Sequence, residues 1–164
     1  MSEFEHPFGD TAPQSHPEAQ AQELASVAQR VGGALVDGLL TSMVVVIPLL
    51  LGLVEIDRID ESLPAAVLLG LFLFGAIYTI VPTALWGQTL GKIAVGTRVV
   101  AEGDGSLPGW RRSVLRWALP GAIGRLPYVG LWVGFAIMAS LVWDPRRRGL
   151  HDRLAGTIVI RVPR

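Results

Sequence analysis

The sequence predicts an all-α polytopic membrane protein with about four transmembrane helices and a small cytoplasmic two-stranded β element. Hydrophobic residues make up 51% of the 164 residues and charged residues only 17%, whereas a soluble domain carries about 25% charge. The apolar residues are gathered into blocks long enough to cross a bilayer. Two short strand-like runs lie outside these blocks. Because isolated strands are unstable, we expect the two runs to pair with each other.

The first two apolar blocks each predict a spanning helix. Residues 31–54 are uncharged apart from Asp37, and Pro48 is expected to kink the second half of this helix. Membrane helices tolerate such a kink where neighbouring groups satisfy the freed carbonyl. Residues 63–85 are uncharged and are followed by Trp86, which is typical of an anchor at the membrane interface. The acidic stretch between the two blocks is short enough to be only a turn.

The strand-like runs are residues 96–101 and 156–162, and their pairing constrains the topology. Paired strands lie on one side of the membrane, so the apolar block between them, residues 110–143, crosses an even number of times or not at all. This block is short for two full spans, and prolines, glycines and an arginine interrupt it. We therefore predict a short broken hairpin, with a partly amphipathic third helix at residues 110–123 and a fourth helix at residues 128–143.

The distribution of positive charge favours four crossings with both termini in the cytoplasm. Lys and Arg are concentrated between residues 86 and 118 and again after Trp143. With four crossings these segments and Arg30 share the cytoplasmic side, whereas three crossings would divide the charges almost evenly. The sequence therefore predicts a multi-pass protein of the plasma (inner) membrane, with the lipid bilayer as its first partner.

Residues 1–29 contain acids, prolines and histidines but no Lys or Arg, which is typical of a disordered tail. We expect a disordered cytoplasmic tail over residues 1–29 and a transmembrane domain over residues 30–162.

The composition excludes several classes of function. There is no Cys, and His6, His16 and His151 are scattered, so the sequence has neither a disulfide framework nor metal-ligand spacing. The segment 87–92 resembles a phosphate loop but has one residue too few between its glycines, with Ile93 after the lysine. We interpret it as a glycine-rich turn that leaves Lys92 at the lipid headgroups. No nucleophile–base pair is visible, so no enzyme activity, cofactor or nucleic-acid partner is expected.

Asp37 is the most informative residue, because an ionised carboxylate inside a span costs roughly 2.5–3.5 kcal/mol. Arg30 lies seven residues earlier, on nearly the same helix face and about 10.5 Å away along the axis. Two interpretations of Asp37 remain open. It is either a structural clamp that binds polar groups of other helices, or a carrier of a proton or cation. Its depth favours a polar network that faces the cytoplasm over a site at the midplane.

The C-terminal part contains further candidate residues. Asp144 and Asp152 flank a basic cluster that is first a topology determinant and secondly a site for anionic lipid headgroups. Asp152 is interpreted either as a salt bridge that fixes the C-terminal strand or as part of an ion path. The spacing of Gly130 and Gly134 allows close helix packing, within the chain rather than in a dimer.

Three local patterns resemble the RDD family of bacterial membrane proteins, which is named for one Arg and two Asp. They are Arg30 to Asp37, the segment 87–100, and Trp143-Asp-Pro-Arg-Arg-Arg-Gly-Leu-His-Asp-Arg-Leu-Ala-Gly-Thr157. The resemblance covers about residues 28–162 and implies that Arg30, Asp37 and a C-terminal acid are the named residues. We assign Asp152 as that acid, with Asp144 as the alternative. His151 lies in the same pattern and is a further candidate residue.

The resemblance implies an activity only in outline, since transport is proposed for some RDD proteins and monovalent cation/proton antiport is associated with others. The first hypothesis is thus a small cation/proton transporter or transporter subunit, with Asp37 titrating, Arg30 tuning its charge and Asp152 at the cytoplasmic mouth. Four short helices supply at most one repeat of a carrier, so a homodimer or a membrane partner subunit is expected. The second hypothesis is a non-catalytic accessory or scaffold protein whose Arg/Asp cluster is structural.

Overall fold

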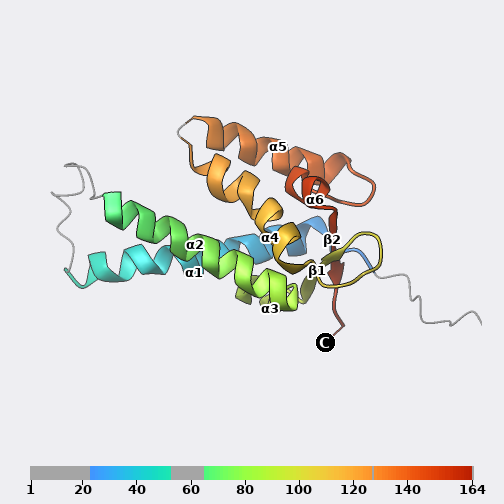
Figure 1. The fold of residues 1–164 in the computed structure, drawn as a ribbon, viewed down its shortest axis with the longest axis horizontal. Helices are drawn as coiled ribbons and strands as arrows, with labels where there is room; N and C mark the ends of the chain where they lie inside the picture. The colour runs from blue at the N-terminus through green and yellow to red at the C-terminus, as the bar shows by residue number, and fades with distance from the viewer. Residues whose placement is uncertain (1–22, 53–64, 127, 164) are drawn as a thin grey trace, which may run out of the picture.

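Helices make up most of the molecule, a computed structural model that describes residues 23–52, 65–126 and 128–163. Figure 1 shows two helical hairpins that extend from a common end, where the sheet and two short helices lie. In chain order the elements are α1 (Val27–Leu50), α2 (Ala65–Trp86), α3 (Leu90–Ala94), β1 (Thr97–Ala101), α4 (Gly109–Trp117), η2 (Ala118–Ala122), η3 (Ile123–Arg125), α5 (Val129–Trp143), α6 (Leu150–Ala155) and β2 (Thr157–Arg161).

The helices α1 and α2 are each long and apolar enough to cross a bilayer. They have 24 and 22 residues, which gives lengths of about 36 and 33 Å against a hydrocarbon core of about 30 Å. A capping box starts α1: Ser26 Oγ accepts the Gln29 N–H at 3.1 Å, and the Gln29 side chain accepts the Ser26 N–H at 3.0 Å. The helices predicted for residues 31–54 and 63–85 are confirmed, with bounds shifted by a few residues.

The second hairpin is broken, as predicted, but its break begins earlier than expected. The α-helix α4 ends at Trp117, and the chain continues as the π-helix η2 and the 3-10 helix η3 before α5. Pro120 explains the change, because it has no N–H and its ring crowds the preceding turn. At Gly121 a Cβ atom would lie 2.2 Å from Trp117 Cε2, so the indole packs against bare backbone. The predicted third helix, residues 110–123, is therefore helical throughout, but it is an α-helix only as far as Trp117.

The predicted pairing of the two strand-like runs is confirmed. Strands β1 and β2 form an antiparallel sheet in which Val99 lies opposite Val159. A third segment joins its edge, since the Ala25 N–H donates to the Val159 carbonyl at 3.0 Å and Leu24 bridges Ile160. Ala25, Val99 and Val159 are buried together as a small apolar core. Leu24 and Ala25, which precede α1, are thus hydrogen-bonded to the C-terminal strand β2.

This attachment shortens the predicted tail. Residues 23–25 lie against β2 and α1 begins at Val27, so the boundary expected at residue 29 is too late. The rest of the predicted tail, residues 1–22, lies outside the described residues.

Two short helices, α3 and α6, were not expected. Before α3 the chain turns at Gly87, whose φ is 70° and where a Cβ would lie 2.4 Å from the Val99 carbonyl oxygen. The helix α6 ends at Gly156, which is left-handed with a φ of 60° and therefore suits glycine. The interpretation of residues 87–92 as a turn is thus right at Gly87 and wrong from Leu90 onward.

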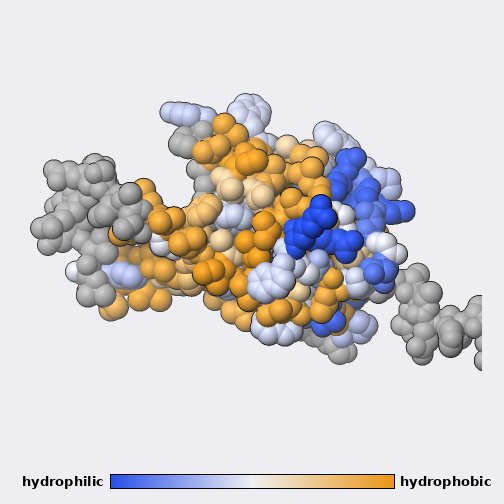
Figure 2. Space-filling view, viewed as in Figure 1, coloured by the Kyte–Doolittle hydropathy of each residue, from blue (hydrophilic) through white to orange (hydrophobic). Residues whose placement is uncertain are grey.

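The surface of the molecule is divided into an apolar part and a polar end. Figure 2 shows hydrophilic side chains gathered at the end that holds the sheet and α6, and hydrophobic side chains over the helical hairpins. Large apolar side chains such as Leu39, Leu69 and Trp132 are exposed on α1, α2 and α5. This division suits a molecule whose hairpins lie in lipid and whose polar end lies in water.

Candidate functional site

Asp152 is a fully buried carboxylate on α6 that joins both helical hairpins. It forms ion pairs with Arg30 of α1 and with Arg116 of α4. It also accepts a hydrogen bond from the Gly149 N–H at 2.9 Å. The side chain of Asp152 is 0% exposed, and those of Arg30 and Arg116 are 6% and 11% exposed. Because water cannot reach the Asp152 carboxylate, the two arginines supply the positive charge that balances its negative charge.

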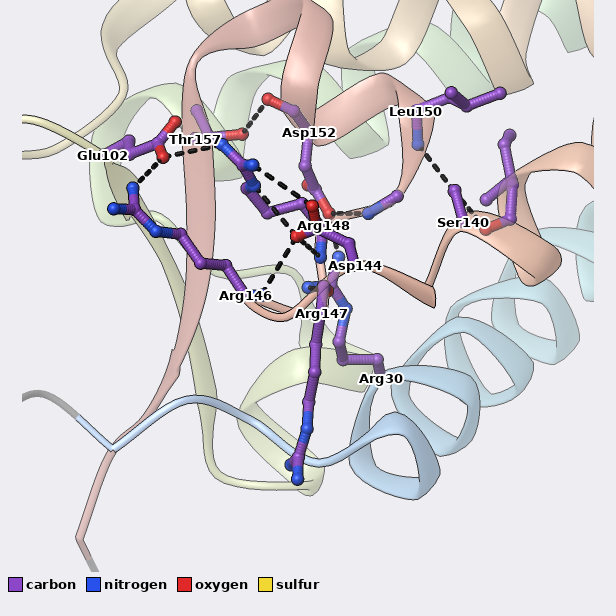
Figure 3. A network of polar contacts seen from close by, with 12 residues as sticks. Arg30, Glu102, Ser140, Asp144, Arg146, Arg147, Arg148, Leu150, Asp152 and Thr157 are labelled. Carbon is purple, nitrogen blue, oxygen red and sulfur yellow. Dashed lines mark hydrogen bonds and ion pairs between the residues drawn. The ribbon is translucent and has the colours of Figure 1, made fainter. Parts of the chain in front are cut away.

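Further hydrogen bonds extend this contact to the sheet. Arg30 Nη1 donates to the Arg147 carbonyl at 2.5 Å, while Arg116 Nη1 donates to Thr157 Oγ1 at 3.2 Å. Figure 3 shows Arg30 reaching this loop from α1, with Thr157 on the opposite side of Asp152. We call this set the Asp152 cluster, with members Arg30, Arg116, Gly149, Asp152 and Thr157.

Asp37 is the centre of a second set of contacts, which fastens α3 to α1 and α2. One carboxylate oxygen accepts the Tyr78 hydroxyl at 2.7 Å and the Gly91 N–H at 2.8 Å. The other accepts the Thr89 hydroxyl at 2.5 Å and Lys92 Nζ at 3.3 Å. We call these five residues the Asp37 cluster. Each carboxylate oxygen therefore has two donors, and Lys92 supplies the compensating charge.

The Asp37 cluster depends on a close crossing of α1 and α3. A Cβ at Gly91 would lie 2.2 Å from the Gly33 carbonyl oxygen and 2.7 Å from Asp37 Cγ. At Gly33, a Cβ would lie 3.1 Å from Val95 Cγ2 and 3.4 Å from the Gly91 carbonyl oxygen. Only glycine at position 91 lets its own N–H reach Asp37, which explains the second glycine of the segment 87–92.

Asp144 belongs to a third, more exposed network. It accepts the Arg148 backbone N–H and side-chain Nε at 3.0 Å each, and the Arg146 N–H at 3.1 Å. Both arginines also pair with Glu102 on the sheet side, as Figure 3 shows. The hydrogen bonds from Arg148 hold the pKa of Asp144 well below its usual value. These contacts order the loop between α5 and α6.

The structure places the predicted residues in separate clusters. Arg30 and Asp37 share a helix face, but Arg30 pairs with Asp152 and Asp37 pairs with Lys92. A charge-tuning role for Arg30 on Asp37 is therefore not supported by a direct contact. His151 lies beside Asp152, with 3.5 Å between its Nε2 and the carboxylate.

The two glycines predicted to promote packing differ in their surroundings. A Cβ at Gly130 would lie 2.0 Å from the Gly124 carbonyl oxygen, so α5 packs against η3 there. At Gly134, no atom of the described residues lies within 4 Å of where a Cβ would be. Packing within the chain thus applies to Gly130 alone.

Sequence reasoning missed the N–H groups of Gly91 and Gly149 and five side chains of the clusters: Tyr78, Thr89, Lys92, Arg116 and Thr157. Lys92 was expected at the headgroups, yet its side chain is only 18% exposed and contacts Asp37. Tyr78 carried a usable signal, because a hydroxyl in the middle of an apolar span needs a partner. Arg116 carried no comparable signal, since it is one of several positive charges in its segment.

Positive charges are crowded where the two buried clusters meet. Burial and the nearby Arg116 lower the pKa of Lys92 to about 8, although Asp37 opposes this shift. Burial also lowers the pKa of His151 well below 6.5, and the charges of Arg116, Arg30 and Lys92 add to that effect. The imidazole is therefore neutral at physiological pH, and this interior carries an excess of positive charge.

His151 is expected to make the folded state sensitive to acid. An unfolded chain binds a proton at this residue below about pH 6.5, whereas the folded chain does not, so stability falls as the pH drops through that value. The loss is at most about 1.4 kcal/mol per pH unit. Thermal unfolding in detergent at about pH 7.5 and about pH 5 should show a smaller acid-induced decrease for His151→Gln than for the wild type. Equal decreases in the two proteins would contradict the assignment.

The comparisons with known proteins give one match. No curated protein and no solved structure matches the chain. Residues 24–156 match the RDD family, which confirms the resemblance carried by the three sequence patterns. The match includes both buried clusters except Thr157, which starts β2. Because it covers about four fifths of the chain, this protein belongs to the RDD family of membrane proteins.

Proposed function

We propose that this protein is a non-catalytic membrane module, an accessory or scaffold protein whose buried Arg/Asp clusters are structural. The main support for this proposal is that the Asp37 carboxylate already has a full set of hydrogen-bond donors. Each of its carboxylate oxygens already accepts two donors, and Lys92 lies 3.3 Å away. A transported cation would need these oxygens as ligands, and it would meet the charge of Lys92 at the same place. The geometry therefore favours a clamp over a carrier.

The arrangement of the hairpins supports the proposed topology, in which four helical segments enter the membrane from the cytoplasmic side. Both hairpins extend from the polar end (Figure 1), and that end carries most of the Lys and Arg residues, which favours a cytoplasmic location. At 15 residues, α5 is about 22 Å long. The second hairpin thus reaches less deeply into a core of about 30 Å than the first one does.

A cation/proton transporter or transporter subunit is the second candidate. The ion pair of Lys92 and Asp37 favours it, because burial brings the pKa of Lys92 to about 8 and a proton can leave this amine near physiological pH. Transport would also require a second copy or a partner subunit, because carriers place their site between two repeats.

Proteoliposomes separate the two candidates. Purified protein is reconstituted with an internal pH dye, and Na⁺, Li⁺ or K⁺ is added outside. We expect the wild type to give no cation-dependent proton flux, and we expect Asp37→Asn to unfold at a lower temperature. The expected loss of stability is about 3–5 kcal/mol, because Lys92 would remain buried beside a neutral side chain. Flux in the wild type that disappears in a folded Asp37→Asn protein would contradict the proposal and support the carrier.

A further inference from the structure

A cavity of about 240 Å³ lies between the two hairpins and the polar end. Its wall is formed by side chains from α1, α2, α3, α4, α5 and α6 together with the sheet. On the visible face, Figure 2 shows hydrophobic side chains over both hairpins next to the hydrophilic end. The cavity is therefore a meeting point of the lipid-facing hairpins and the two buried clusters.

The polar side of this cavity is cationic. Arg30, Lys92 and Arg116 line it from three different helices. Two carboxylates, Asp37 and Asp152, pair with these three cations. Among the described residues, three cations thus share two directly paired carboxylates in an interior where solvent screening is weak, which leaves one positive charge in excess at the cavity wall.

The same wall offers hydrogen-bonding groups that the fold leaves unused. Ser113 is 2% exposed, and within the described part of the chain its Oγ has no hydrogen-bond partner. The Nδ1 atom of His151 is buried and likewise lacks a partner among the described residues. Lys92 donates to Asp37 and Thr89, so one of its three protons remains available. Buried polar groups of this kind normally have a partner.

We propose that this cavity binds one phosphate group carrying a single negative charge. Such an anion neutralises the excess charge and accepts hydrogen bonds from the Lys92 ammonium and the Ser113 hydroxyl. These two donors come from α3 and α4. A tetrahedral phosphate presents oxygens in more directions than a planar carboxylate and so suits donors from separate elements. A cation is disfavoured, because three positive side chains surround the space.

The opposite wall of the cavity is apolar, with Trp117 and Pro120 from the broken hairpin and Ile137 and Met138 from α5. A lipid with a phosphodiester headgroup suits both walls of the cavity. Its phosphate would lie at the cationic wall, and its hydrocarbon chains would lie along these apolar residues. Free dihydrogen phosphate offers the same charged group without the hydrocarbon. The lipid headgroup and free phosphate both present a singly charged phosphate group, and an experiment can tell which of the two binds.

The test measures binding to the full chain in a non-ionic detergent, with thermal unfolding and calorimetry as readouts. Three probes are titrated: inorganic phosphate, dihexanoylphosphatidylglycerol as a lipid-borne phosphodiester, and zwitterionic dihexanoylphosphatidylcholine as the control. We expect saturable stabilisation by an anionic probe and none by the control. Response to phosphatidylglycerol alone identifies a lipid headgroup, whereas an equal response to phosphate identifies the free anion. No saturable response to either anionic probe overturns the proposal.

Variants locate the site. Ser113→Ala removes a hydroxyl without a partner in the described chain, so the fold should be unaffected while binding weakens about 5-fold. Lys92→Gln should weaken binding at least about 10-fold, although it also disturbs the Asp37 cluster. Arg147→Gln is the matched control, because this exposed side chain does not line the cavity and points away from Asp152 in Figure 3. Full affinity in Ser113→Ala together with a loss in Arg147→Gln would place binding at the surface and overturn the proposal.

Discussion

Replacing Asp152 with Asn is expected to lower the free energy of unfolding by about 3–5 kcal/mol. Asn keeps the size of the side chain but leaves Arg30 and Arg116 buried without their anion. Uncompensated buried cations are unfavourable because neither water nor a carboxylate stabilises them. Thermal or denaturant unfolding in detergent measures the effect, and low yield of folded protein is expected as well.

Asp104→Asn is the matched control for this substitution. The Asp104 carboxylate lies in an exposed turn, where it contacts Ser106, so its replacement should change stability by less than about 0.5 kcal/mol. A double-mutant cycle of Asp152→Asn with Arg116→Gln should show strong coupling, because removing the cation relieves part of the penalty. If Asp152→Asn and Asp104→Asn were equally stable, the buried ion pairs would not hold the hairpins to α6.

Replacing Gly91 with Ala is expected to destabilise the protein by about 3 kcal/mol. The new Cβ would lie 2.2 Å from the Gly33 carbonyl oxygen, and backbone cannot move aside as the end of a long side chain can. We therefore expect α3 to move away from α1, which lengthens the hydrogen bond from the Gly91 N–H to Asp37. Unfolding in detergent measures the loss, and a spectroscopic probe on α3 would report the displacement.

Gly38→Ala serves as the control for Gly91→Ala. Gly38 also lies on a helix, yet nothing among the described atoms comes within 4 Å of where its Cβ would be. Alanine there should be neutral or stabilising by up to about 1 kcal/mol, since alanine favours a helix over glycine. A loss at Gly38 as large as that at Gly91 would indicate a general intolerance of α1 and α3 to substitution, not a specific close crossing.

The long elements were predictable because their signals are local. Residues 31–54 and 63–85 are apolar over more than the thickness of a bilayer, and length alone identifies them. The strands followed from β-branched runs beside tight turns, and their pairing followed from the instability of a lone strand. The helices α3 and α6 have only 5 and 6 residues, too few for a periodic pattern. Their formation depends on tertiary contacts.

The candidate site was predictable only in part, for a related reason. Spacing on one helix placed Arg30 and Asp37 on a common face, but their separation of about 10.5 Å along the axis lets each meet a different neighbour. Asp37 meets Tyr78 and Lys92, which are 41 and 55 positions away in the chain. Asp152 was assigned a salt bridge from its basic surroundings, and its actual cations come from α1 and α4. A single sequence contains no local pattern that predicts such contacts between distant residues.

The ion pair of Arg30 with Asp152 joins residues 122 positions apart, and this separation has a consequence for synthesis of the protein. Chains are made from the N-terminus at about 5–20 residues per second, so α1 emerges long before its anionic partner. A nascent chain that stops before α6 contains both apolar hairpins, yet its buried arginines have no carboxylate. Truncated products would thus carry unpaired charge in their interior. A chain truncated before α6 is therefore expected to be less stable than one that contains Asp152.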